Sequence, residues 1–260
     1  MKKLYVLPVL FILILSFSAE ARIIFDPETL FQDGEKFFTA QPPDYPAAEK
    51  FYLEAAEAGH GMAQLRLGFM YAEDHFTGVA TDLTRAEYWF LKAAEQDAGD
   101  ARFRLGVFYR LTKTPPEPEK ARHWLRLAAE AGHSAAQYDL AMMCLESGNG
   151  QSRDEAQWHN WMEKAAMQDN LHAAIALSRA YQHGLNGLEK DARKSVQWAA
   201  KAAEKTKSRL WFRRIGDAYF SGEGNLAANP ALAKFWYEKA AKKGDEHAVR
   251  RLSEIQNLKP

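Results

Sequence analysis

The chain is poor in several features that would restrict its fold. Cys144 is the single cysteine in 260 residues, so no intrachain disulfide can form. Basic and acidic residues balance at 34 each, which argues against the broad basic surface of a general nucleic-acid binder. β-branched residues are scarce and no alternating strand pattern stands out. The abundant residues are Ala, Leu, Glu, Lys and Arg, which favour helix, so we expect an all-α protein stabilised by packing.

Catalytic motifs are also missing from the sequence. There is no serine elbow motif and no pair of histidines with the spacing of a zinc protease. His60 and His133 each follow a glycine at the same repeat position, which is typical of turn and cap residues. Cys144 stands in an apolar column and is predicted to be a buried structural thiol. We therefore expect a protein that is not an enzyme and has no cofactor or metal.

The N-terminal segment has the layout of a secretory signal peptide. Lys2 and Lys3 precede an apolar run over residues 4–17, and Ala19-Glu20-Ala21 resembles a cleavage site. The run is shorter than the roughly 20 residues of a membrane span. We predict a signal peptide over 1–21 and a mature chain over 22–260 that is periplasmic or secreted and has no membrane span. The alternative is an uncut N-terminal anchor.

A pattern of large aromatics followed four residues later by alanine recurs every 35–38 residues. A second column pairs an aliphatic residue with a small one and usually places a tyrosine three residues later. Two columns with the same spacing indicate internal repeats. The aromatics are Phe51, Trp89, Trp124, Trp161, Trp198 and Trp236. The second column begins at Leu67, Leu105, Leu140, Leu177 and Ile215.

A third column predicts where each second helix begins. Seven residues before each aromatic stands a residue that suits a helix N-terminus, usually aspartate. These residues are Asp44, Asp82, Glu117, Asp154, Asp191 and Asn229. Glu117 is the weakest cap of the six. Each unit is thus a helical hairpin whose apolar stripe is buried only when neighbouring hairpins stack on it.

The pattern resembles the Sel-1-like repeat, a relative of the tetratricopeptide repeat. The stretches "AQLRLGFMY", "GVATD" and "AEYWFLKAAE" between Ala63 and Glu95 match the family motif most closely. The resemblance implies a right-handed α/α superhelical solenoid over 22–260. We expect about five hairpins from Ala63 onward, a degenerate hairpin over 26–58, and a C-terminal capping helix from Asp245. Regular cysteine pairs, typical of relatives reported to hydrolyse β-lactams, are absent here.

Three departures from the motif predict local changes in stacking. Trp158 and Trp211 stand in columns otherwise held mostly by alanine, and a proline-rich stretch, "TKTPPEPE", replaces the usual glycines in one loop. The column of large aromatics itself could be mistaken for a sugar-stacking row. Its helical period and its alanine partners favour a place in the core instead.

First helices line the concave surface in tetratricopeptide arrays, and the resemblance implies the same here. The positions two, three and six after each anchor alanine carry apolar side chains and arginines, which suit a segment of another protein. The candidate partner-binding residues are Leu65, Arg66, Phe69, Phe103, Arg104, Val107, Tyr138 and Met142. The alternative is that these side chains only pack the first helices on each other. A basic stretch over 205–214 is a second candidate surface, with a solvated helix junction as its alternative.

These observations favour an exported, non-catalytic adaptor that binds another protein through its concave surface. We expect it to act as a monomer. Two roles fit the family: an immunity-type inhibitor of a toxic secreted enzyme, or a modulator of cell-wall enzymes or virulence-associated factor. The alternative from a different class is a hydrolase acting on β-lactam or cell-wall substrates.

Overall fold

The computed structural model describes residues 26–96, 99–146 and 153–257. The predicted signal peptide and the glycine loop at 148–150 lie outside these residues. The described chain contains thirteen α-helices, one π-helical turn and no strand. The helices are α1 (Pro27–Phe38), α2 (Tyr45–Glu57), α3 (Gly61–Ala72), α4 (Leu83–Glu95), α5 (Gly99–Val107), α6 (Pro118–Glu130), α7 (Ser134–Cys144), α8 (Glu155–Met167), α9 (Leu171–His183), α10 (Ala192–Thr206), α11 (Arg209–Ser221), α12 (Pro230–Ala241) and α13 (Glu246–Asn257).

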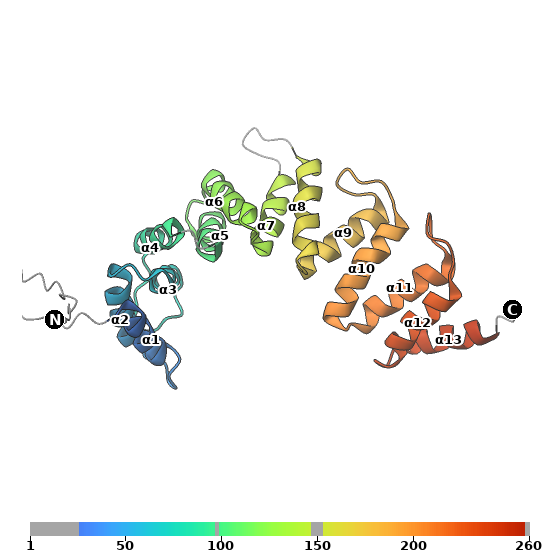
Figure 1. Cartoon of the computed structure of the whole chain (residues 1–260), viewed down its shortest axis with the longest axis horizontal. Helices are drawn as coiled ribbons and strands as arrows, with labels where there is room; N and C mark the ends of the chain where they lie inside the picture. The colour runs from blue at the N-terminus through green and yellow to red at the C-terminus, as the bar shows by residue number, and fades with distance from the viewer. Residues whose placement is uncertain (1–25, 97–98, 147–152, 258–260) are drawn as a thin grey trace, which may run out of the picture.

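The helices form a curved stack in chain order, an α/α solenoid with its two ends far apart (Figure 1). Consecutive helices pair as hairpins from α1–α2 to α11–α12, and α13 closes the C-terminal end. In the N-terminal half, α3 and α5 lie on the inner side of the arch, and α4 and α6 lie on its outer side (Figure 1). The predicted hairpins, the N-terminal pair over 26–58 and the C-terminal helix are thus confirmed.

The predicted caps begin the second helices. The side chain of Asp44 accepts a hydrogen bond from the amide of Ala47 at 3.0 Å, and Asp82 accepts from the amides of Thr84 and Arg85. Asp154, Asp191 and Asn229 cap their helices in the same way. Glu117 makes no side-chain cap bond, as expected for the weakest of the six. Side-chain oxygens at these positions satisfy amides that a helix N-terminus leaves free.

Close contact between the two helices of a hairpin depends on one small residue. A Cβ built on Gly68 would lie 2.5 Å from the Phe90 ring, and one on Gly106 would lie 2.7 Å from Leu125. In the first and last hairpins, a Cβ built on Gly34 or on Gly216 would lie 2.6 Å from a tyrosine ring of the paired helix. Glycine therefore makes room for a large side chain, as the sequence predicted from the small residue beside leucine.

The aromatic column lies less deep than the sequence suggested. Trp89, Trp161 and Trp236 are buried, but Trp124 and Trp198 are only half-buried. The next residue along the chain is buried in every second helix. That column holds Tyr52, Phe90, Leu125, Met162, Ala199 and Tyr237, all buried. The tryptophans thus flank this seam, and the interpretation of the column as core is confirmed for three of them.

The predicted irregularities occur where the motif departs from its pattern. Trp158 is 2% exposed inside the core, and its indole nitrogen has no hydrogen-bond partner within the described part of the chain. Before the proline-rich stretch, α5 continues into a π-helical turn, η1 (Phe108–Thr112). Trp211, the third departure, is half-buried and lines a cavity between α9, α10 and α11.

The core is divided into two clusters of buried residues. The larger one runs from Leu30 to Tyr181 and also includes Ala202, and the smaller one runs from Val196 to Ala248. They adjoin at α10, where Ala202 belongs to the larger cluster and Ala203 to the smaller. None of the helices in the described part of the chain has the length and apolar character needed to cross a bilayer.

Candidate protein-binding surface

The candidate residues lie on the first helices of successive hairpins, and their side chains connect one hairpin to the next. We call the inner surface the set Phe38, Arg66, Phe69, Phe103, Arg104, Val107, Tyr138 and Met142, on α1, α3, α5 and α7. All of them except the exposed Arg104 are half-buried. Because each first helix repeats the same register, equivalent side chains lie side by side along the stack.

An arginine connects α1 to α3. The Arg66 guanidinium donates two hydrogen bonds to the Glu35 carboxylate, Nε to Oε1 at 2.8 Å and Nη2 to Oε2 at 3.0 Å. Its Cζ also lies 5.1 Å from the centre of the Phe38 ring. Glu35 accepts a further hydrogen bond from the Tyr52 hydroxyl at 2.6 Å. Such a bidentate pair holds the guanidinium in a fixed orientation, half open to solvent.

A second arginine connects α3 to α5. The Cζ of Arg104 lies 5.2 Å from the Phe69 ring centre and 5.5 Å from that of Phe103. Its Nε is 3.7 Å from Asp100, an ion pair between two exposed groups that contributes little binding energy. A groove of about 260 Å³ lies beside this arginine. It is lined by Phe38, Arg66, Phe69, Met70, Glu73, Phe76 and Arg104.

Aromatic contacts continue the surface from α5 to α9. The Phe103 ring stacks on His133 with 4.5 Å between ring centres, and Tyr138 lies 5.8 Å from His172. Arg110 of η1 donates to Glu146 at 2.6 Å and approaches Asp139 to 3.9 Å. Burial raises the pKa of the Asp139 carboxyl, and the nearby Arg110 opposes that shift.

One candidate residue does not belong to the surface. Leu65 is 4% exposed and lies in the hydrophobic core, so a partner could not reach it. A first helix is packed against its own hairpin and against both neighbouring units. Leu65 is covered in its own unit, whereas Phe103 and Tyr138, at the equivalent position of the next two units, are only half-buried.

Both interpretations of the remaining residues have a structural basis. Phe69 and Arg104 do pack first helices on each other, as the alternative required. Side chains of this surface also remain partly accessible to solvent, because Arg104 is exposed and Phe69, Val107 and Met142 are only half-buried. The contacts fix their positions in advance, which lowers the entropy that a partner would lose by ordering them.

The basic stretch over 205–214 does not form one patch. Arg213 lies 3.6 Å from Asp245, Arg214 donates to Gln182 at 2.7 Å, and Arg209 donates to the carbonyl of Gly244. Lys207 pairs with Glu204 at 2.9 Å. These cations are distributed over several helix junctions, which supports the interpretation as a solvated junction.

The polar residues considered for chemistry have structural roles. His60 and His133 cap α3 and α7, because each Nδ1 accepts a hydrogen bond from the amide three residues later. Cys144 is buried, and burial raises the pKa of its thiol, which disfavours the reactive thiolate. Within residues 26–96, 99–146 and 153–257, no group of histidine, cysteine or acidic side chains is arranged to hold a metal ion.

Sequence reasoning missed a set of polar pairs between neighbouring hairpins. The hydroxyl of Tyr109 donates to Glu87 at 2.8 Å, and Tyr71 donates to Glu49. The Lys120 ammonium lies 5.0 Å from the Tyr109 ring centre. In each of these two pairs the acid stands 22 residues before the tyrosine. That constant spacing is the signal that would have revealed them.

The comparisons with known proteins agree with the repeat pattern. The family model described as Sel1 repeat matches six segments that together span most of the chain. These segments are 30–60, 61–97, 99–133, 134–170, 171–207 and 213–245. The first one corresponds to the N-terminal hairpin, which the sequence pattern alone had suggested was degenerate.

Two solved structures share the fold. A Sel1 repeat protein from Oxalobacter formigenes is 30% identical, with a TM-score of 0.65. The match covers 90% of this chain and 67% of that one. The c5321 protein, described as a protective antigen of uropathogenic Escherichia coli strains, is 29% identical with a TM-score of 0.63. That match covers 88% of this chain and 49% of the c5321 chain.

A curated relative is a longer protein. Chitin synthase regulatory factor 3 from Schizosaccharomyces pombe is 34% identical over 139 residues, which are 53% of this chain and 15% of the relative. The chain therefore matches a small part of that relative and about half of c5321. No enzyme family is indicated by the matching family model or by these two structures. Six repeats in one continuous stack, matched by sequence and by structure, place this chain in the Sel1 repeat family, whose members are scaffolds for protein interaction.

Proposed function

We propose that this protein is an exported, non-catalytic adaptor that binds another protein through its inner surface. The observation that carries the proposal is the groove between α1, α3 and α5. There the exposed Arg104 guanidinium lies on two aromatic rings, and its only ion-pair partner among the described residues is the exposed Asp100. Arginine and aromatic residues dominate the binding energy of protein interfaces.

The chemistry of the groove favours one class of partner segment. The half-buried Phe38 and Phe69 supply apolar area, and Arg104 supplies a cation whose ion pair is readily exchanged. A helix or extended segment with an apolar side chain next to a carboxylate would satisfy both. Glu73, at the edge of the groove, would repel a second carboxylate placed there.

The proposal of export rests on residues 1–21, with their basic start, apolar run and small-residue cleavage pattern. In a bacterium such a protein would act in the periplasm or outside the cell. Two roles are then open: inhibition of a toxic secreted enzyme, or modulation of enzymes that act on the cell wall. The name of the curated relative, a regulatory factor, supports a role exerted on another protein.

The test is a pull-down from periplasmic extract of the native host with the mature chain as bait. We expect a partner in stoichiometric amount whose capture is lost with Arg104→Glu. This substitution reverses a charge on an exposed side chain, so the fold should be retained. Arg126→Glu is the matched control, because Arg126 is exposed on the second helix α6.

The identity of the captured protein separates the two roles, since a toxic enzyme indicates an inhibitor and a cell-wall enzyme indicates a modulator. Capture that is equal for both variants would place binding elsewhere on the molecule. Turnover of a β-lactam or a peptidoglycan fragment by the pure protein alone would contradict the proposal and favour the hydrolase.

A further inference from the structure

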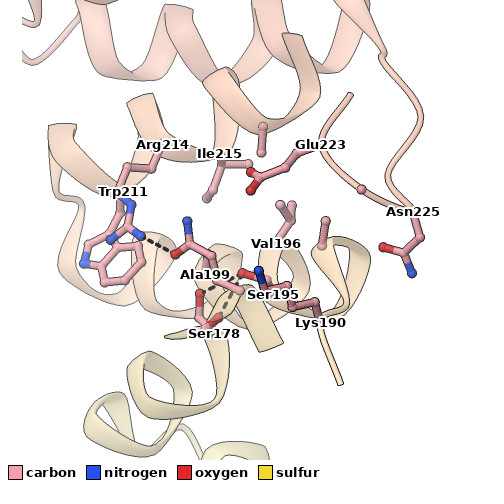
Figure 2. A pocket seen from close by; sticks show the side chains of 14 residues that line it. Ser178, Lys190, Ser195, Val196, Ala199, Trp211, Arg214, Ile215, Glu223 and Asn225 are labelled. Carbon is pink, nitrogen blue, oxygen red and sulfur yellow. Dashed lines mark hydrogen bonds between the residues drawn. The ribbon is translucent and has the colours of Figure 1, made fainter. Parts of the chain in front are cut away.

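A cavity of about 120 Å³ lies between α9, α10 and α11, at the junction of the two core clusters (Figure 2). Its wall on one side is apolar, formed by Val196, Ala199 and Ile215. Neither this cavity nor its residues belong to the inner surface described above. Its position in the repeat explains how it arises.

The cavity arises because a large core residue is missing from one hairpin. In the other hairpins a small residue of the first helix faces a large one of the second, as Gly68 faces Phe90. At the equivalent positions of the α9–α10 hairpin stand Ser178 and Ala199, and both line the cavity. Trp211, which stands in an alanine column, forms another wall.

Two hydroxyl groups form a buried polar side of the cavity. Ser178 is 2% exposed and Ser195 is 8% exposed. The Ser195 hydroxyl donates to the Ser178 carbonyl at 2.9 Å, whereas among the described residues the Ser178 hydroxyl has only the Ser195 oxygen, at 3.5 Å. A buried hydroxyl so weakly bonded gains from a polar ligand atom placed beside it.

Charges of both signs line the cavity: the half-buried Arg214, the exposed Glu223 and a second, exposed cation, Lys190. The Arg214 guanidinium lies over the Trp211 ring at 4.9 Å and donates to the neutral Gln182 amide. Figure 2 shows the Glu223 carboxylate on the far side, turned toward Ile215 and the middle of the space. Within the described residues neither Arg214 nor Glu223 forms an ion pair.

We propose that this cavity binds a small zwitterion of amino-acid size. Arg214 receives the ligand's carboxylate, Glu223 receives its ammonium group, and the Ser178 hydroxyl hydrogen-bonds to a polar atom of the ligand. Separated charges of opposite sign suit a molecule that carries both. The cavity is well below the roughly 300–1,000 Å³ of sites for drug-sized ligands, so nucleotides and oligosaccharides are too large.

The first experiment measures the melting temperature of the mature protein with each of the twenty standard L-amino acids in turn. We expect at least one to raise the melting temperature by about 3 °C at about ten times its Kd. Its N-acetyl derivative and its amide, which each lose one charge, should give a smaller shift. Calorimetric titration of that amino acid should show one site per chain.

Variants locate the site. Arg214→Gln and Glu223→Gln should each weaken binding at least tenfold, and Ala199→Leu should abolish it by filling the cavity. Arg179→Gln is the matched control, since Arg179 is exposed on α9 and does not line the cavity. If Ala199→Leu fails to fold, Arg214→Gln and Glu223→Gln still test the site.

Two results would overturn the proposal: no amino acid shifts the melting temperature, or the shift is unchanged in both Arg214→Gln and Glu223→Gln. Neither result bears on the adaptor function, because the groove of α1, α3 and α5 shares no residue with this cavity.

Discussion

At the residue scale, the close approach of paired helices depends on complementary sizes. Glycine faces the large rings of Tyr52 and Phe90, whereas in the α7–α8 hairpin Ala141 stands at the glycine position and Met162 at the ring position. A slightly larger residue on one helix is thus matched by a more flexible one on the other. The free energy of packing is sensitive to single methyl groups, because protein interiors are close-packed.

This matching of side-chain sizes can be tested in the α3–α4 hairpin. Gly68→Ala places a Cβ 2.5 Å from the Phe90 ring and should lower the free energy of unfolding by about 2 kcal/mol. Phe90→Met alone should cost about 1 kcal/mol. The double variant copies the α7–α8 pair. Its loss of unfolding free energy should be clearly smaller than the sum of the losses of the two single variants. Urea denaturation of all four proteins measures this, and additive losses would argue against size matching.

A second residue-scale prediction concerns Glu87 and pH. Burial opposes ionisation, but hydrogen bonds from Lys113 and Tyr109 outweigh it and hold the pKa of Glu87 below 4.5. A lowered pKa in the folded state means that the ionised form stabilises the fold above about pH 4.5. That stabilisation is lost as the pH falls through the folded-state pKa.

Glu87→Gln should therefore lower stability by about 1 kcal/mol at neutral pH and by less in acid. Thermal melts between neutral pH and pH 3 check this. Glu95→Gln is the control, because Glu95 is exposed and, among the residues that the structure describes, pairs only with Lys92 on its own helix. If both variants follow the wild-type pH profile, the pair between α4 and η1 does not contribute as described.

At the element scale, the caps show what sequence patterns predict well. The aspartate positions located the second helices because a capping side chain acts locally, through amides two or three residues away. The depth of each side chain was harder to predict. Leu65 was assigned to the surface, and all the tryptophans of the aromatic column to the core, because helical periodicity gives directions around one helix but not what covers each direction.

The unequal caps lead to a prediction. Asp82→Ala should destabilise the protein by about 1 kcal/mol, because two amides of α4 lose their acceptor. Glu117→Asp should stabilise it by about 0.5 kcal/mol, since α6 gains a cap that it now lacks. Thermal unfolding of the two variants compares them directly. A gain from Asp82→Ala, or a loss from Glu117→Asp, would contradict the assignment of these caps.

At the scale of the whole molecule, stacked repeats need not unfold together. The core divides at α10, and the C-terminal helix α13 contributes one buried residue, Ala248. We expect amides of α12 and α13 to exchange with solvent at a lower free energy of opening than those of α4 to α8. Native-state hydrogen exchange measures this. Equal opening free energies throughout would show one cooperative unit instead.

The candidate site was only partly predictable from sequence. The resemblance to repeat proteins directed attention to the first helices, and the pattern located Arg104 and Phe69. It did not reveal that these two side chains contact each other across hairpins, or that Glu35 holds Arg66. Such contacts depend on how far one hairpin is rotated against the next, which no local pattern specifies.

The central claim is that the inner surface makes the contact with a partner. A photo-crosslinking residue in place of Val107 or Met142, both half-buried on first helices, tests it most directly. Tyr88, 52% exposed on the second helix α4, is the control position. The account predicts a crosslinked partner from the two inner positions and none from position 88. A crosslink from position 88 alone would contradict it.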